Sequence, residues 1–236
     1  MLVVLAIDAL EYALVEKYQC ENLKQKYYGK TNISEFSQPR TMVLWSSFMT
    51  GENKEKEILK LGDKEMWNKQ FDIKETFFFN FQDPKIIDLP GFSYDKKQHE
   101  EERELLKAYF ATDSPEEKTK IRNDYNAHAF SHHRKIKTEF LEALEGNYDF
   151  VLGYFSVADV IGHLNFGNNL MMKMIYKDLD EIAGAIKHNF IVLSDHGMKA
   201  IGQFGDHSEY GFWSTSFKDI NNPKITDFSK IIVGMM

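Results

Sequence analysis

The sequence predicts an α/β fold: a central, mostly parallel sheet flanked by helices, with a helical cap or insertion. Short apolar runs rich in Val and Ile recur along the chain, as in strands that are covered on both faces of a sheet. Segments with helical patterning separate these runs, which is typical of alternating strands and helices. The middle of the chain is strongly charged. We therefore interpret residues 1–236 as one α/β domain in which residues 56–147 form a helical cap or insertion.

The N-terminal part begins with a predicted strand. Residues 2–7 form a continuous apolar run that ends at Asp8. Residues 11–28 are expected to form a helix or lid segment, although their apolar period is poor. Residues 41–48 lead into a loop-to-helix element, and the aromatic run at 76–81 is expected to be a strand.

Capping and apolar patterns predict the remaining elements. Ser114, followed by Pro115 and Glu117, is a capping-box pattern that opens a long helix, which extends to about residue 144 and ends at Gly146. The other expected elements are a helix at 98–110, strands at 148–155 and 190–194, a helix at 168–187, a strand at 209–215 and a helix at 227–232.

Composition and charge argue against several classes of protein. Hydrophobic residues make up 43% of the chain, which supports a substantial core. The net charge of -7 argues against a nucleic-acid scaffold, because phosphate backbones are bound mainly by Lys and Arg. No apolar run approaches the roughly 20 residues that cross a bilayer, and Asp8 interrupts the apolar start too early for a signal peptide. With Cys20 as its single cysteine, we expect a soluble, cytoplasmic protein without a membrane partner, of unknown oligomeric state.

Acidic residues and a histidine follow three of the apolar runs. Asp8 follows the first run, Asp159 follows the second closely, and the adjacent pair Asp195 and His196 follows the third. Ligands of open α/β sheets collect at the carboxyl ends of the strands, so these side chains are candidate metal ligands. Helix capping or a turn is an equally good explanation for a single carboxylate at such a place.

Two further histidines extend this pattern. His163 lies four residues after Asp159, so the two side chains share a face if the segment is helical. His207 follows Asp206 in a loop bracketed by glycines, where a lone histidine is usually only solvated. The occurrence of all four segments in this order is what favours a metal site.

A threonine motif precedes these segments. Thr41 begins the run TMVLWSSFMTG, in which a serine stands at 47 and Thr-Gly at 50–51. This frame, together with the ordered Asp and His residues, resembles the alkaline phosphatase superfamily, and within it the type I phosphodiesterase / nucleotide pyrophosphatase branch. The resemblance covers about residues 1–55 and 148–236. It implies one metal site made by Asp8, Thr41, Asp195 and His196, and a second made by Asp159, His163 and His207.

The resemblance also implies a reaction. Mixed carboxylate and imidazole ligands suit two divalent transition metals, Zn²⁺ or alternatively Mn²⁺, better than Ca²⁺ or Mg²⁺. Thr41 is expected to attack phosphorus in a phosphodiester or nucleotide pyrophosphate, giving a phospho-threonine that water then hydrolyses. The substrate would be a small phosphate ester or nucleotide. The alternatives are a phosphomonoesterase or phosphomutase, and an inactive metal-binding homologue. No third metal site is evident, which favours diesters over the more highly charged monoesters.

One position departs from the family pattern. Many members have an Asn three residues after the nucleophile, where it donates a hydrogen bond to a phosphoryl oxygen. Here that residue is Leu44, which cannot donate. The guanidinium of Arg40 and the backbone amide of Met42 are the candidate substrate contacts in its place.

A histidine cluster in the charged middle segment has two interpretations. His128, His132 and His133 lie in AHAFSHHRKIK, and the first two share a helical face, so a metal site is conceivable. A solvated, partly basic face is the interpretation that we favour.

Overall fold

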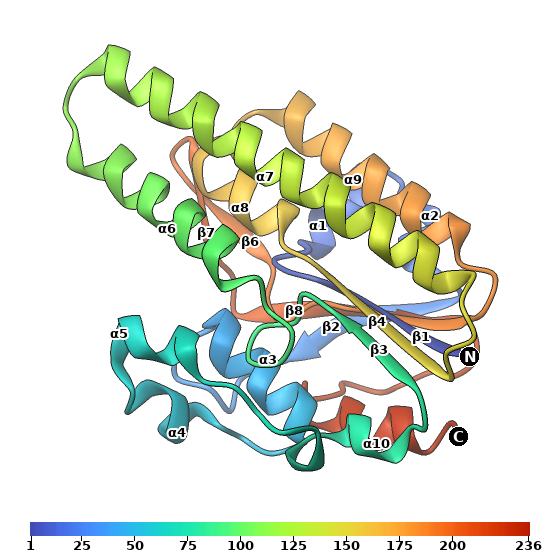
Figure 1. The fold of residues 1–236 in the computed structure, drawn as a ribbon. Coiled ribbons are helices and arrows are strands. Elements are labelled where there is room, and N and C mark those ends of the chain that lie inside the picture. Colours follow the sequence, from blue (N-terminus) through green and yellow to red (C-terminus); the bar gives the residue numbers. More distant parts are fainter.

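The computed structural model describes residues 1–236, and its centre is a six-stranded sheet in the order β2-β8-β5-β1-β4-β3 (Figure 1). Strand β1 (Leu2–Ile7) runs parallel to both of its neighbours, β4 (Phe150–Phe155) and β5 (Asn189–Leu193). Strand β3 (Pro84–Ile87) is parallel to β4 at one edge. At the other edge, β8 (Tyr210–Thr215) is antiparallel to both β5 and β2 (Tyr27–Asn32). Only β8 opposes the common direction, so the predicted α/β class with a mostly parallel sheet is confirmed.

Helices cover both faces of this sheet (Figure 1). On one face lie α1 (Tyr12–Lys17), α2 (Glu21–Lys24), α7 (Pro115–Leu144), α8 (Val157–Asn165) and α9 (Asn169–Ala185). On the other face lie α3 (Thr41–Thr50), α4 (Glu55–Leu59), α5 (Gly62–Glu65) and α10 (Asp227–Val233). Helix α6 (Lys96–Ala111) pairs with α7 as an antiparallel hairpin. No helix of the chain has both the length and the apolar character to cross a membrane.

The central strand separates two hydrophobic cores. Along β1, Val3 and Leu5 belong to the core beneath α7, α8 and α9, whereas Val4 and Ala6 belong to the core beneath α3 and α10. Alternate side chains of a strand point to opposite faces, so a sheet covered on both faces needs the unbroken apolar run seen here. This burial fixes the position of Asp8, the first polar residue after β1.

The aromatic segment at 76–81 was predicted as a strand, and this prediction is wrong. Phe77–Asn80 form a 3₁₀ turn. Phe77, Phe78 and Phe81 are buried against Phe150, whereas Phe79 is exposed. The buried positions in this segment follow the period of a helix rather than the alternation of a strand. The strand of this region is instead β3, which begins at a proline and has only four residues.

The segment at 11–28 is not one helix. It contains α1, α2 and the beginning of β2, and the backbone at Gln19 and Gln25 has φ of 52°. Such values interrupt a right-handed helix, which explains the poor apolar period. A second, two-stranded sheet was not predicted at all. It pairs β6 (Met198–Ile201) with β7 (Phe204–His207), which packs on α8.

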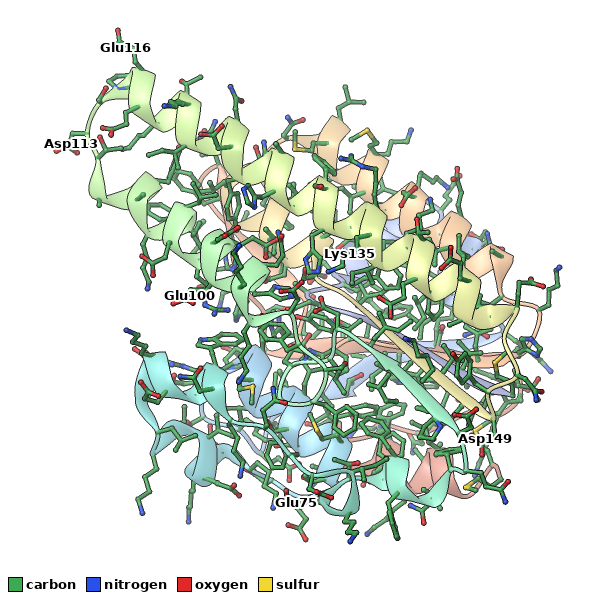
Figure 2. The ribbon with its side chains drawn as sticks, in the orientation of Figure 1. Glu75, Glu100, Asp113, Glu116, Lys135 and Asp149 are labelled. Atoms are coloured by element: carbon green, nitrogen blue, oxygen red, sulfur yellow. The ribbon has the colours of Figure 1, made fainter.

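The α6–α7 hairpin is the main part of the expected helical cap. Ser114 caps α7 by accepting from the Glu117 amide at 3.3 Å, with Pro115 in the first turn, as the capping pattern predicted. Asp113 and Glu116 lie at the tip of the hairpin, far from the sheet (Figure 2). Residues 56–147 also contribute β3 to the sheet, so this segment is not purely helical.

Candidate metal centre

Asp8, Asp195 and His196 meet at the carboxyl edge of the sheet. Asp8 follows β1, and the other two follow β5, which is its parallel neighbour. His196 Nε2 lies 3.3 Å from Asp8 Oδ1 and 3.3 Å from Asp195 Oδ2. All three side chains are buried. Their ligand atoms all lie within 4.8 Å of one another, a separation that one metal ion can bridge.

Asp159, His163 and His207 form a second group beside the first. Asp159 and His163 are one turn apart on α8, and His207 ends β7. The Nε2 atom of His163 lies 3.3 Å from Asp159 Oδ2, and that of His207 lies 3.4 Å from Asp159 Oδ1. These ligand atoms are also within 4.8 Å of one another.

Thr41 lies between the two groups. It is the first residue of α3, and its Oγ1 is 3.5 Å from His196 Nε2. The rings of His196 and His207 stack with centroids 3.8 Å apart, which joins the groups. Thr41, Asp8 and Asp159 line one cavity of about 220 Å³. The structure therefore brings together all seven residues that the sequence suggested as metal ligands or nucleophile.

The three histidines present the same nitrogen to this centre. The Nδ1 atoms of His163, His196 and His207 face the backbone carbonyls of Gly205 (3.3 Å), Gly197 (3.1 Å) and Pro39 (2.7 Å), respectively. An Nδ1–H that donates to a carbonyl leaves Nε2 deprotonated and free to bind a cation. This orientation is the usual one for metal-ligating histidines.

Several buried atoms of the centre have no hydrogen-bond partner. They are Oδ1 of Asp8, Oδ1 of Asp159, both carboxylate oxygens of Asp195, and Nε2 of His207. Each such atom costs about 1–3 kcal/mol when it is left unpaired. Carboxylate oxygens and imidazole nitrogens that converge without donors are the ligand set of a divalent transition metal, so these residues fit such an ion.

The pKa values reflect the same crowding of negative charge. Burial and the nearby Asp159 carboxylate raise the pKa of Asp8 to about 7. Burial and the Asp8 carboxylate also raise the pKa of Asp195. Burial opposes ionisation of Asp159 as well, but His163 and His207 outweigh it and hold the pKa of this carboxyl well below its usual value. A cation between Asp8 and Asp195 would relieve their repulsion.

A buried glutamate holds the turn that carries Asp195 and His196. Glu11 accepts hydrogen bonds from the Met198 amide at 3.1 Å and from the Tyr210 hydroxyl at 2.7 Å. Gly197 has no room for a side chain here, because a Cβ atom would lie 2.4 Å from Glu11 Oε2. Glu11 and Tyr210 were not predicted from the sequence, since neither belongs to a motif. Tyr154, whose hydroxyl donates to Asp8 Oδ2, was not predicted either.

The candidate substrate contacts differ in their accessibility. The Arg40 guanidinium pairs with Asp63 and, through Nε, donates to Gln38 at 2.7 Å. The Met42 side chain is buried in the core, but its backbone amide belongs to the first turn of α3, where amides have no partner within the helix. Leu44 is fully buried in the same core, so its side chain faces away from the cavity.

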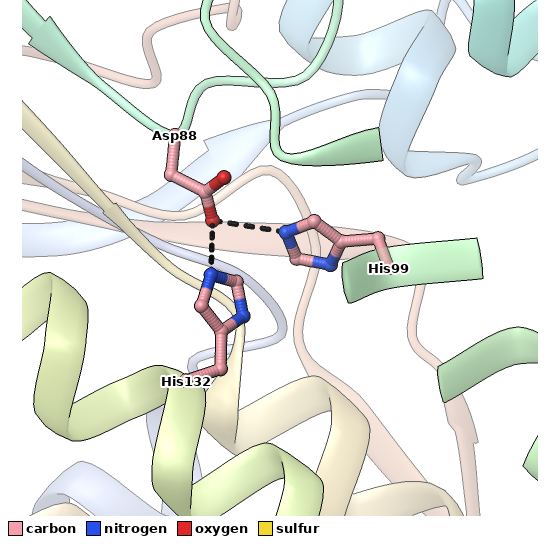
Figure 3. Close-up of side chains that lie close together, drawn as sticks. All are labelled: Asp88, His99 and His132. Atoms are coloured by element: carbon pink, nitrogen blue, oxygen red, sulfur yellow. Dashed lines mark hydrogen bonds and ion pairs between the residues drawn. The ribbon is translucent and has the colours of Figure 1, made fainter. Parts of the chain in front are cut away.

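The middle segment contains a third cluster of metal-ligand type, which was not predicted from the sequence. It consists of Asp88, His99 and His132 (Figure 3). The expectation that no third site exists is therefore wrong, and it no longer favours diesters over monoesters. The favoured interpretation of His132 as part of a solvated face is therefore wrong, because the residue is buried. His128 is half-exposed and lies 3.7 Å from Glu101, whereas His133 pairs with Asp178 at 2.6 Å.

Comparison with known proteins gives similarity in structure alone. No family model and no curated protein matches the chain. Among solved structures, murine ectonucleotide pyrophosphatase / phosphodiesterase 5 is similar with a TM-score of 0.44 and 14% identity. An inactive variant of the same protein in complex with AMP gives a TM-score of 0.45 and 14% identity. Each match covers 86% of this chain and 58% of the murine one. At this level the similarity says nothing about the activity of the chain.

Proposed function

We propose that the chain is a metal-dependent phosphoryl-transfer hydrolase that cleaves phosphodiester or nucleotide pyrophosphate bonds. The observation that carries this proposal is the position of Thr41. Its hydroxyl lines a cavity between two groups of buried ligands, with Oγ1 3.5 Å from His196 Nε2. A hydroxyl nucleophile between two cation sites is an arrangement suited to in-line displacement at phosphorus.

Two sets of residues would hold the metals. Asp8, Asp195 and His196, together with Thr41, would bind one ion, and Asp159, His163 and His207 would bind the other. Zn²⁺ suits these mixed oxygen and nitrogen ligands best, and Mn²⁺ is the alternative. When bound, the metals lower the pKa of the Thr41 hydroxyl and stabilise negative charge on the transferring phosphoryl group.

Thr41 is the proposed nucleophile. Its Oγ1 forms a bond to phosphorus while the bond from phosphorus to the leaving oxygen breaks, which gives a phospho-threonine. Water then attacks the same phosphorus and returns Thr41 to its free form. The first-turn amides of α3, that of Met42 among them, lie at the positive end of the helix and would orient the phosphoryl oxygens. The Arg40 guanidinium would contact the substrate only after its ion pair with Asp63 is broken.

Aromatic residues support a nucleotide among the possible phosphate esters. Trp67 and Tyr94 line the cavity, and their rings stack with centroids 5.9 Å apart and an interplanar angle of 17°. The guanidinium of Arg103 lies 4.3 Å from the centroid of the Trp67 ring. Aromatic rings beside a cation suit a base next to a phosphate. A base would have to displace one of the present partners of these rings, because Tyr94 also stacks on His99 and Arg103 covers Trp67.

A paired substrate assay tests the class of reaction. Zinc-loaded protein should hydrolyse bis-nitrophenyl phosphate faster than mono-nitrophenyl phosphate. The reverse preference would favour the alternative, a phosphomonoesterase or phosphomutase on the same residues. Absence of turnover on either ester and on nucleotide pyrophosphates would favour an inactive metal-binding protein.

The Thr41→Ala variant tests the nucleophile. We expect a fall in kcat on the order of 10⁴-fold or more, because the covalent route is lost. Metal content should remain largely unchanged, since the carboxylates and histidines stay in place. Thr50→Ala, at the other end of the same helix, is the matched control and should retain turnover. Full activity in Thr41→Ala would rule out the assignment.

A further inference from the structure

Three buried side chains from separate elements converge outside the centre described above. Asp88 follows β3 directly, His99 lies in the first turn of α6, and His132 lies in the middle of α7 (Figure 3). Their relative exposures are 5%, 3% and 3%, so water does not solvate them. The cluster therefore joins the edge of the sheet to both helices of the α6–α7 hairpin.

Both histidines direct Nε2 at the same carboxylate oxygen. Asp88 Oδ2 lies 2.9 Å from His99 Nε2 and 3.0 Å from His132 Nε2, and the three atoms are within 4.8 Å of one another. The other oxygen of Asp88 accepts from the Asp95 amide at 2.8 Å, which fixes the carboxylate. Two nitrogens and one oxygen that converge in this way form a mixed ligand set suited to Zn²⁺.

A second carboxylate lies behind the two rings. Glu102 Oε2 is 3.1 Å from His99 Nδ1, and Glu102 Oε1 is 3.6 Å from His132 Nδ1. Gln98 donates to Glu102 Oε1 at 3.1 Å and so holds this carboxylate. A carboxylate on the far side of a histidine fixes the ring and raises its basicity as a ligand. The rings thus present Nε2 forward and have an acceptor behind them, as do the three histidines beside Thr41.

An ion network without metal is the competing explanation. Two protonated imidazoles between two carboxylates would balance their charges, and each N–H would then be expected to point at an oxygen. His132 Nε2 does not fit this arrangement, because it is buried, has no hydrogen-bond partner, and approaches Asp88 without hydrogen-bond geometry. A metal ion bound between Asp88, His99 and His132 would give His132 Nε2 a partner.

The backbone at Asp88 has an unusual conformation. Its φ is 59°, a left-handed conformation that is uncommon for residues other than Gly. Strain of this kind costs about 1–3 kcal/mol and tends to persist where a side chain must be aimed at a functional site. Here the conformation turns the carboxylate from the end of β3 toward the two histidines.

We propose that Asp88, His99 and His132 bind a third divalent transition metal, and that Glu102 orients the two histidines. The site is buried and offers three protein ligands, so a fourth position on the ion would remain for water or another small ligand. The site fixes the α6–α7 hairpin to the sheet beside the substrate cavity. His99 and Glu102 line that cavity, and the ring of Tyr94, which also lines it, stacks on His99 at 3.9 Å. The ion therefore holds one wall of the cavity in place.

Anomalous diffraction from crystals of the zinc-loaded protein tests this directly. Data collected above and below the zinc edge should show a peak between Asp88, His99 and His132, separate from any peaks beside Thr41. Absence of a peak at the cluster would overturn the proposal, whatever occupies the other centre. A peak at the cluster with none beside Thr41 would support it while contradicting the proposed two-metal hydrolase.

Metal analysis of variants gives an independent test that does not depend on turnover. Zinc content after exhaustive dialysis should be three per chain in the wild type and lower by one in His132→Gln. His128→Gln, which changes a half-exposed histidine one turn earlier on the same helix, is the matched control and should keep the wild-type content. Equal zinc content in His132→Gln and wild type, with both folded by circular dichroism, would overturn the proposal.

A variant that keeps all three ligands tests the site even if His132→Gln does not fold. Glu102→Gln should retain the fold but release the cluster zinc more readily, with about 10–100-fold weaker affinity in competition with a chelator. Unchanged affinity in this variant would contradict the orienting role of Glu102.

Discussion

Glu11→Ala should loosen the turn that places Asp195 and His196. The Glu11 carboxylate is buried and accepts from the Met198 amide at 3.1 Å and from the Tyr210 hydroxyl at 2.7 Å. Alanine removes the acceptor of the buried Met198 amide and of the half-buried Tyr210 hydroxyl, and also that of the Ala13 amide and of the more distant Ser208 hydroxyl.

The structure sets the size of this effect. A buried donor left without a partner costs about 1–3 kcal/mol. The Met198 amide should cost this full amount, and the part-buried Tyr210 hydroxyl and Ala13 amide less because water can reach them, so we expect a loss of about 2–4 kcal/mol in the free energy of unfolding. This is a large part of the about 5–15 kcal/mol that stabilises an ordinary domain. Because Glu11 holds the turn that carries Asp195 and His196, weaker zinc binding should accompany the loss.

Urea unfolding of the metal-free protein measures the change, and a double-mutant cycle identifies its source. In a Tyr210→Phe background, Glu11→Ala leaves one donor fewer unpaired. It should therefore cost less than in the wild type. Glu21→Ala, which removes an exposed glutamate from α2, is the control and should change stability by no more than about 0.5 kcal/mol.

Two results would refute this reasoning. One is a Glu11→Ala variant with stability within about 0.5 kcal/mol of the wild type. The other is a loss that is the same with and without the Tyr210 hydroxyl, which would show that the hydroxyl is not held by Glu11.

Three further predictions concern the same edge of the sheet. Burial and Asp159 raise the pKa of Asp8 to about 7 in the folded, metal-free protein. Stability from this group is thus fully present below its unfolded pKa of 3.8 and is lost progressively as pH rises from there to about 7. Thermal melts with chelator should show this fall, and zinc should reverse it. Gly211→Ala should lower the free energy of unfolding by about 3 kcal/mol or more, because its Cβ would lie 2.0 Å from the Ser194 carbonyl oxygen, and expression with urea melts would reveal it. Leu44→Asn should not raise kcat and should destabilise the protein by about 2–4 kcal/mol in the same melts, because this position is in the core.

Part of the site could be predicted from the sequence because its residues follow strands that are buried on both faces. Such strands are recognisable as unbroken apolar runs, and the polar residues that directly follow each run must lie at the edge of the sheet. Asp8 and Asp195 were found in this way. Because β1 and β5 are parallel neighbours, their ends bring these two residues together. Asp159 and His163 could be predicted to lie together because they are one helical turn apart.

The residues that were missed depend on contacts between distant segments. Asp88 follows a strand of only four residues that begins with a proline, and the aromatic run just before it had the stronger strand pattern. His99 and His132 come together only because α6 and α7 fold back on each other. Glu11 is a single buried carboxylate, and its partners Met198 and Tyr210 lie 187 and 199 residues away. No local pattern in the sequence reports such pairs.

The segment without a recognisable motif is thus the one that shapes the cavity. Thr41 and its neighbouring ligands come from the two ends of the chain, whereas Trp67, Tyr94 and His99 come from the middle. The ends would supply the chemistry of phosphoryl transfer, and the middle would decide which phosphate ester fits. Since the middle segment is attached to the sheet through β3 and the Asp88 cluster, substitutions in that cluster should alter KM more than kcat. Substitutions at Thr41 should do the opposite.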